Sequence, residues 1–207
     1  IGENNRIFQF VSLGEEPQDK KYAGEPTRLE IGDNNVIREF CTFNTGTVQD
    51  AGVTRIGNDN WVMAYVHVAH DCVIGDHCIF ANNASLAGHV SVQDYAILGG
   101  FTGVHQFCRV GAHVITGIAS VIRQDIPPYF TVAGSPAAPH GINSEGLKRR
   151  GYSAEALSAI KRAYKTLYKS GLGLSEAQSA IAVEAEVHPE LKLLANFLAV
   201  SGRGIIR

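Results

Sequence analysis

The chain has 207 residues, of which 45% are hydrophobic, and its formal net charge is −2. A nearly neutral charge does not favour nucleic acid or an anionic membrane surface as a partner, and no segment approaches the ~20 consecutive apolar residues of a membrane-spanning helix. We therefore expect one globular domain with an appendage, no nucleic-acid partner and no stable membrane insertion.

The first 55 residues alternate between six-residue repeats and polar insertions. Residues 1–12 and 31–42 each hold two repeats, and the insertions cover residues 13–30 and 43–55. Insertions into repeat proteins form loops on one face, which is often the binding face. Because the chain begins at Ile1 inside a repeat, we expect that it lacks an N-terminal part.

A period of six then continues without interruption from Ile56 to about Pro127. Eleven of the twelve first positions are large and apolar, and the fifth positions are mostly small or branched. A helix would need a period near 3.6 and a simple strand a period of 2. The pattern predicts a solenoid of short strands with three repeats, or 18 residues, in each coil. The 22 glycines would serve corners that need positive φ.

The cysteines follow the same period. Cys72, Cys78 and Cys108 all occupy fifth positions, which fits inward-facing side chains better than a disulfide or a zinc site. We expect a reduced, cytoplasmic protein.

The six-residue period ends near residue 128, and a helical spacing of apolar residues begins after residue 153. We predict a β-helix over residues 1–128, an irregular linker over 129–152 and a small helical domain over 153–207 that covers the strand edge of the last coil. Ser153 is placed to cap the first helix and Gly171 to end it. A second helix would begin at Ser175 with a capping box, and a third would follow Pro189.

A coil of 18 residues also predicts which side chains are neighbours. It stacks His70 on Gly88 and Asp71 on His89, whereas the histidines at 77 and 113 lie elsewhere and are expected to be structural. Six residues converge on one edge of the solenoid: His67, His70, Gly88, His89, His105 and Gln106. This clustering favours a functional site.

Two other interpretations of the cluster remain. Hexapeptide carbonic anhydrases bind zinc with two histidines on one coil and one on the next, but here Val110 stands five residues after His105. We therefore predict no metal. A non-catalytic scaffold would need neither the cluster nor a charged loop opposite it.

Several longer segments closely resemble the acyl-[acyl carrier protein]–UDP-N-acetylglucosamine O-acyltransferase family, which begins lipid A synthesis. They include QDKKYAGEPT, HVAHDCVIGDHCIFANNASLAGHVSVQDYAILGGFTGVHQFCRVGAHV and IPPYFTVAGSPAAPHGINSEGLKRRGY, and the resemblance covers essentially the whole chain. It implies a left-handed parallel β-helix, a homotrimer with sites between neighbouring β-helices, and acyl carrier protein and UDP-N-acetylglucosamine as substrates. No cofactor is implied beyond the phosphopantetheine that the carrier protein brings. The related N-acyltransferase of the same pathway is the alternative.

The resemblance also implies roles for individual residues. His70 would be the general base and the N–H of Gly88 would bind the oxyanion, while Asp71 would orient His70 unless its side chain points across the coil. The sugar, diphosphate and thioester arm would be held by His67, His89, His105 and Gln106. Asp19 and Lys21 would lie near the glucosamine, and Asn143, Glu145 and Arg149 would contact the nucleotide.

Two further features bear on the acyl donor. Residues 148–170 contain seven basic residues and one acidic residue, a net charge of +6, which suits the acidic carrier protein. Ile118 stands where the resembling long-chain enzymes have glycine. It predicts a shorter 3-hydroxyacyl chain, nearer to about ten carbons than to about fourteen, unless Ile118 packs inside the solenoid.

Overall fold

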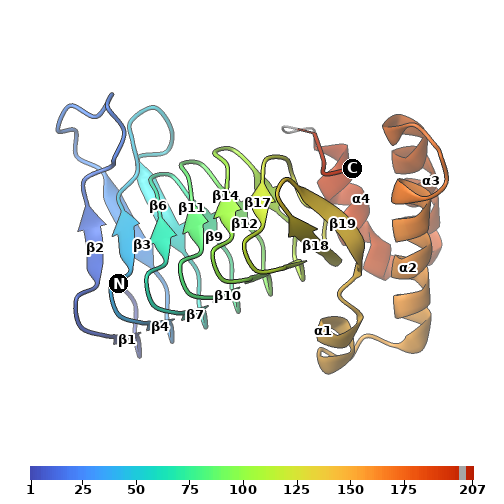
Figure 1. Cartoon of the computed structure of the whole chain (residues 1–207), viewed down its shortest axis with the longest axis horizontal. Helices are drawn as coiled ribbons and strands as arrows, with labels where there is room; N and C mark the ends of the chain where they lie inside the picture. The colour runs from blue at the N-terminus through green and yellow to red at the C-terminus, as the bar shows by residue number, and fades with distance from the viewer. Residues whose placement is uncertain (201–203) are drawn as a thin grey trace.

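The computed structural model describes residues 1–200 and 204–207, so residues 201–203 of the predicted helical domain lie outside the described residues. It shows a left-handed parallel β-helix, with a hairpin and helices at its C-terminal end (Figure 1).

Three sheets form the sides of the prism. Sheet 1 contains β1 (Arg6–Ile7), β4 (Val36–Ile37), β7 (Trp61–Val62), β10 (Ile79–Phe80), β13 (Ile97–Leu98), β16 (Ile115–Thr116), β18 (Phe130–Gly134) and β19 (Ala137–Ile142). Sheet 2 contains β2 (Ser12–Glu15), β5 (Thr42–Asn44), β8 (His67–Val68), β11 (Ser85–Leu86), β14 (Gly103–Val104) and β17 (Val121–Ile122). Sheet 3 contains β3 (Arg28–Ile31), β6 (Val53–Ile56), β9 (Val73–Ile74), β12 (Ser91–Val92) and β15 (Arg109–Val110).

The predicted coil of 18 residues is confirmed by the strand register. His67 pairs with Ser85, and Ser85 pairs with Gly103, all in parallel. The first and fifth positions of the repeat fill the interior, where Phe80 and Leu86 are buried. All four cysteines belong to the described residues, where they are buried and form no disulfide. Burial of these side chains removes apolar surface from water, which is worth about 1.5–3 kcal/mol for each large residue.

The corners differ from the prediction in one respect. Positive φ falls on the fourth position of the repeats, which holds residues such as Asp71 (φ 59°), His89 (φ 61°) and Phe107 (φ 64°) rather than glycine. Many glycines instead sit at the second position, where coils approach closely. A Cβ on Gly75, for example, would overlap Oδ1 of Asp94 on the next coil.

The corners form three edges that run along the prism. We call the edge from sheet 2 to sheet 3 the loop edge, because both insertions emerge there as loops of residues 16–27 and 45–52, at the top left of Figure 1. The edge from sheet 1 to sheet 2 is the aromatic edge, along which Phe10, Phe40 and Tyr65 stack with centroids 5.1 and 4.9 Å apart. The edge from sheet 3 to sheet 1 is the helix edge.

The irregular linker expected over residues 129–152 is replaced by regular structure. Strand β18 extends sheet 1 in parallel with β16, and β19 folds back antiparallel to it. A short helix, α1 (Ser144–Arg149), follows at the helix edge. The prolines at 127 and 128 lie in the corner between Ile126, which bridges to sheet 3, and β18 of sheet 1.

The C-terminal helices largely follow the prediction. Helix α2 (Ala154–Tyr168) is capped by Ser153, whose hydroxyl accepts from the N–H of Ala156 at 3.2 Å. Helix α3 (Leu174–Val187) begins before Ser175, so the capping box was misplaced: Glu176 accepts from the N–H of Gly173 at 2.8 Å. A 3₁₀ turn (Pro189–Leu191) then leads into α4 (Lys192–Ala199).

The helices share a second apolar core with the end of the prism, separate from the interior of the coils. Tyr129 belongs to this second core, and its hydroxyl donates to the carbonyl of Glu190 at 2.7 Å. Of the helices in the described residues, none is long and apolar enough to cross a bilayer.

Candidate functional site

His70 lies at the loop edge, in the corner between β8 and β9. Its ring packs directly against Gly88 on the next coil, where a Cβ would overlap Cε1 and Nε2 of the imidazole. The N–H of His89 donates to the carbonyl of His70 at 3.0 Å, which fixes the two coils in register at this point. The predicted stacking of His70 on Gly88 is therefore confirmed.

Asp71 points along the loop edge and contacts the histidine beside it. Its Oδ2 is 2.8 Å from Nδ1 of His70, and its side chain is only 1% exposed. The backbone N–H of Asp71 donates to Oγ1 of Thr54 at 2.8 Å, which anchors the residue in its left-handed conformation. The alternative in which Asp71 points across the coil is wrong.

His89 completes a compact group one coil further on. Its Nδ1 is 2.9 Å from Oδ2 of Asp50, and its Nε2 is 3.8 Å from Oδ2 of Asp71. Its ring meets that of His70 edge to face at 5.1 Å and stacks on Phe107 at 4.4 Å. Each ring therefore has one nitrogen bound to a carboxylate.

The group of His70, Asp71 and His89 places one possible ligand atom from each residue within 4.8 Å of the others. Zinc would need these atoms at about 2.0–2.2 Å from one centre. In the present arrangement the same carboxylate already receives hydrogen bonds from a histidine and from the threonine of the 45–52 loop. The donor set fits a hydrogen-bonded proton-transfer group better than a zinc site.

His67 and His105 line an apolar groove of about 590 Å³ on the outer surface of sheet 2. Nδ1 of His67 is 2.8 Å from Oγ1 of Thr42, and burial lowers the pKa of the His67 imidazole. His105 and Gln106 are exposed two coils beyond His70, and Nδ1 of His105 is 3.2 Å from the carbonyl of Gln106. The groove runs beside the loop edge and is suited to an apolar chain.

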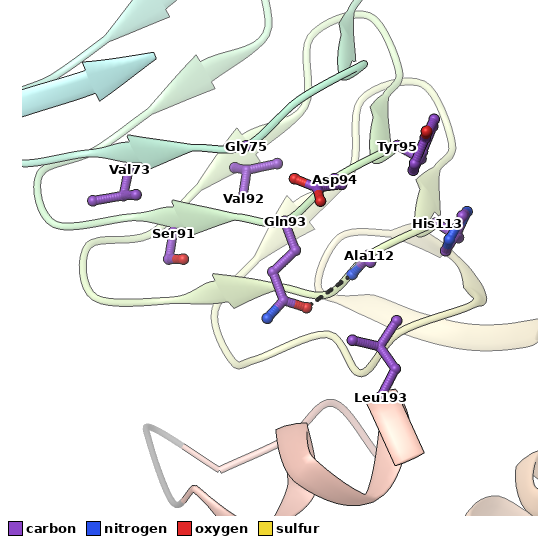
Figure 2. Close-up of a pocket in the computed structure, with 10 residues that line it drawn as sticks. All are labelled: Val73, Gly75, Ser91, Val92, Gln93, Asp94, Tyr95, Ala112, His113 and Leu193. Atoms are coloured by element: carbon purple, nitrogen blue, oxygen red, sulfur yellow. Dashed lines mark hydrogen bonds between the residues drawn. The ribbon is translucent and has the colours of Figure 1, made fainter. Parts of the chain in front are cut away.

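A second groove of about 360 Å³ lies on the outer surface of sheet 3, where Leu193 of α4 faces it (Figure 2). Its polar groups serve the fold: Oε1 of Gln93 accepts from the N–H of Ala112 at 3.0 Å (Figure 2). His113 at its end bonds the hydroxyl of Tyr152 at 3.2 Å, and burial lowers the pKa of this histidine to about 4. Neither His70 nor His89 lines this groove.

The predicted nucleotide-contact residues lie elsewhere on this chain. They belong to α1 or its cap, at the helix edge, on the opposite side of the molecule from the loops in Figure 1. Asn143 is buried and committed to the fold, since it donates to the carbonyl of His113 at 2.9 Å and accepts from the N–H of Gly146 at 3.1 Å. Glu145 pairs with Lys148 at 2.8 Å, and Arg149 is exposed.

The remaining predicted residues are at the surface. Asp19 and Lys21 lie in the first insertion at the loop edge, where the N–H of Lys21 donates to Asp19 at 3.0 Å. Ile118 lies at the aromatic edge next to β17 and is 74% exposed, so the alternative in which it packs inside the prism is wrong.

The prediction missed the 45–52 loop as a part of this site. Thr47 donates both its N–H and its hydroxyl to Asp71, and Asp50 bonds His89. The insertion interrupts the count of 18, so spacing could not align these residues with the corner that they contact. The available signal was that the insertion falls at the corner one coil before His70.

Comparison with known proteins gives a consistent result. A family model described as UDP N-acetylglucosamine O-acyltransferase, domain 2, matches residues 125–206, and the bacterial transferase hexapeptide model (six repeats) matches residues 54–88. The acyl-[acyl-carrier-protein]–UDP-N-acetylglucosamine O-acyltransferase of Thiobacillus denitrificans is 73% identical over 203 residues, which cover 98% of this chain and 79% of that protein. The enzyme of the same name from Janthinobacterium sp. (strain Marseille) is 61% identical over 208 residues, covering 99% and 79%.

A solved structure agrees with these matches. The UDP-N-acetylglucosamine O-acyltransferase of Moraxella catarrhalis superposes with a TM-score of 0.96 at 48% identity, covering 99% of this chain and 79% of that one.

Proposed function

The chain belongs to the acyl-[acyl-carrier-protein]–UDP-N-acetylglucosamine O-acyltransferase family, and on that premise we propose how its own residues carry out the reaction. The protein transfers an acyl chain from acyl carrier protein to UDP-N-acetylglucosamine, the first step of lipid A biosynthesis. We propose that the chain is a 3-hydroxyacyl group and that the acceptor is the 3-hydroxyl of the sugar. The relatives compared carry the O-acyltransferase name, which does not favour the N-acyltransferase alternative.

His70 is the general base in this proposal. Asp71, as a carboxylate, can only accept hydrogen bonds, so Nδ1 of His70 carries the proton and Nε2 is free to take another. Nε2 removes the proton of the sugar hydroxyl as the oxygen attacks the thioester carbonyl. The tetrahedral intermediate then collapses, the carbon–sulfur bond breaks, and the proton passes from Nε2 to the leaving thiolate. The Nδ1 contact with Asp71 is the observation that carries this assignment.

The oxyanion of the intermediate needs a fixed donor close to the base. Gly88 packs against the edge of the His70 ring that carries Nε2. Among the described residues, none accepts a hydrogen bond from the N–H of Gly88. This supports the proposal that Gly88 stabilises the oxyanion, a contribution worth about 10²–10³ in rate in other enzymes. No cofactor is needed beyond the phosphopantetheine arm of the carrier protein.

A homotrimer would complete the substrate site. His67, His89, His105 and Gln106 lie on or beside the loop edge, together with Asp19 and Lys21, whereas Glu145 and Arg149 lie at the helix edge of the same chain. In this proposal one sugar nucleotide contacts both groups because they come from neighbouring copies. The exposed aromatic edge, where Phe10 and Phe101 are uncovered, supports such an assembly. A cytoplasmic location is proposed as well, and the four buried cysteines, which form no disulfide in the described residues, support it.

The proposed function is tested by a direct assay of acyl transfer. The protein is incubated with UDP-N-acetylglucosamine and a series of 3-hydroxyacyl carrier protein thioesters, and the products are identified by mass. Replacement of the base, His70→Ala, should reduce kcat by about 10²–10⁴-fold, whereas His77→Ala, which alters an exposed histidine at the helix edge, should not. A His70→Ala variant with more than about a tenth of the wild-type kcat would contradict the assignment.

A further inference from the structure

The 45–52 loop lies over the loop edge, and Thr47 in this loop contacts the carboxylate of Asp71. The N–H of Thr47 donates to Oδ1 at 2.8 Å, and its hydroxyl donates to Oδ2 at 2.6 Å. Thr47 is 1% exposed, so water does not compete for these bonds. Such short, buried bonds to an ionised group are among the stronger ones in proteins.

Three donors therefore converge on one carboxylate. Oδ2 receives both the hydroxyl of Thr47 and Nδ1 of His70, while Oδ1 receives the N–H of Thr47. The shared oxygen links the loop directly to the histidine. The rotamer of Asp71, and through it the orientation of His70, depends on a residue that is 23 positions earlier in the sequence than His70.

We propose that Thr47 is a positioning residue for acyl transfer, which holds Asp71 in place and limits how strongly its carboxylate attracts a proton to His70. The proposal rests on the proposed function of His70. Thr47 is buried beneath the carboxylate, and its role is exerted through Asp71.

The electrostatic part of the proposal follows from the groups around His70. The carboxylate of Asp71 lies 2.8 Å from Nδ1 of His70. His89 and His67 are the other titratable neighbours, and Asp50 bonds Nδ1 of His89. The hydroxyl dipole of Thr47 presents its positive end to Asp71 and offsets part of its charge. Without the hydroxyl the carboxylate accepts a proton more strongly, so the acid limb of the pH profile of kcat/KM should lie at a higher pH than in the wild type.

The experiment compares variants that differ by one hydroxyl. Thr47→Val and Thr47→Ala both remove the hydroxyl and keep the backbone N–H, whereas Thr47→Ser keeps both donors. The control is Thr45→Val in the same loop, because the hydroxyl of Thr45 bonds Thr27 at 2.9 Å and does not contact Asp71. The readouts are kcat, the KM for each substrate, the pH profile of kcat/KM and the thermal unfolding temperature.

For Thr47→Val and Thr47→Ala we expect kcat to fall by about tenfold with an unchanged KM for the sugar nucleotide. The acid limb of the kcat/KM profile should move to higher pH. Thr47→Ser should retain close to wild-type values, and Thr45→Val should leave the profile unmoved. A purely structural role would lower the unfolding temperature without moving the profile.

The results separate the two proposals. If the wild type does not transfer an acyl group, or His70→Ala remains active, the proposed function fails. If both behave as proposed, the role of Thr47 is overturned when any folded variant without the hydroxyl keeps the wild-type profile or moves it to lower pH. It is also overturned when Thr47→Ser, with its hydroxyl present, loses activity as Thr47→Val does.

Discussion

The imidazole of His70 occupies the space that a side chain on Gly88 would fill. A Cβ at residue 88 would overlap two atoms of the ring, although the two residues are one full coil apart in the sequence. The position of the base therefore depends on the absence of a side chain on the next coil.

Gly88→Ala should consequently displace the His70 ring and lower kcat by at least about tenfold in a folded protein, because small displacements of a reacting group are costly. The control is Gly100→Ala. Gly100 is also at the third position of its repeat, but a Cβ there would meet only Asn82 at 3.4 Å and Ile118 at 3.9 Å, which are ordinary contacts. Steady-state kinetics and thermal unfolding of both variants test this. Equal activity in the two would show that His70 tolerates the extra methyl group.

Helix α2 carries the exposed lysines expected to meet the carrier protein. Arg162 is unsuitable for a charge reversal, since it bonds Glu184 at 2.8 Å and His188 at 3.0 Å and so links α2 to the following segments. Lys165→Glu should instead raise the KM for the acyl carrier protein thioester several-fold at low salt and leave the KM for UDP-N-acetylglucosamine unchanged. The difference should shrink as salt screens the charges. Lys192→Glu at the start of α4 is the matched control, and the same rise in that variant would argue against docking on α2.

Ile118→Gly should shift the preferred donor towards longer acyl chains. The side chain stands exposed at the aromatic edge next to β17, and we expect it to limit the space for the end of the acyl chain there. Each methylene that gains a buried place contributes about 0.8 kcal/mol, or roughly fourfold in kcat/KM. Competition between thioesters of different length, with products separated by mass, measures the shift. Ile118→Val should move it less. If Ile118→Gly keeps the wild-type preference for acyl-chain length, Ile118 does not select the length of the donor.

His113 should make the protein less stable as the pH falls. Burial lowers its pKa to about 4, whereas an unfolded chain would have the ordinary value of about 6.5. Between these values the unfolded state binds more protons, so stability is complete above pH ~6.5 and declines towards pH ~4, by about 3 kcal/mol at most. His113→Phe keeps the stacking with Tyr95 and should flatten this dependence in denaturant titrations at several pH values. His77→Phe, at an exposed position of the same stack, should not change the slope.

Much of the site could be predicted because the repeat converts sequence distance into spatial position. Eighteen residues separate His70 from Gly88 and Asp71 from His89, and the structure stacks both pairs. The contact of Thr47 with Asp71 could not be predicted in the same way, because the loop that contains Thr47 lies outside the repeat. The side chain of Asp71 could not be oriented either, since its direction depends on the donors of that loop.

The parts of the fold that were mispredicted lie where the period ends. Strand β18 continues sheet 1, but β19 reverses direction, and no periodic signal marks a single antiparallel strand. Glycine was expected at the corners, whereas the left-handed residues are mostly polar or aromatic, as at Asp71 and Phe107. Stacking between equivalent corner side chains on successive coils, as between His89 and Phe107, accompanies these conformations.

The antiparallel strand β19 also bears on how the protein avoids polymerising. Coils of a parallel solenoid offer the same strand direction to any copy that approaches end to end, so an open last coil could recruit a second molecule, then a third. Here sheet 1 ends on β19, which runs against the coils. At the end of sheet 3, Val110 bridges to Ile126 and Asp125 bridges to Ile205, both in parallel. On sheet 1 an incoming coil would meet a strand of the wrong polarity, so this side of the prism resists growth into fibres.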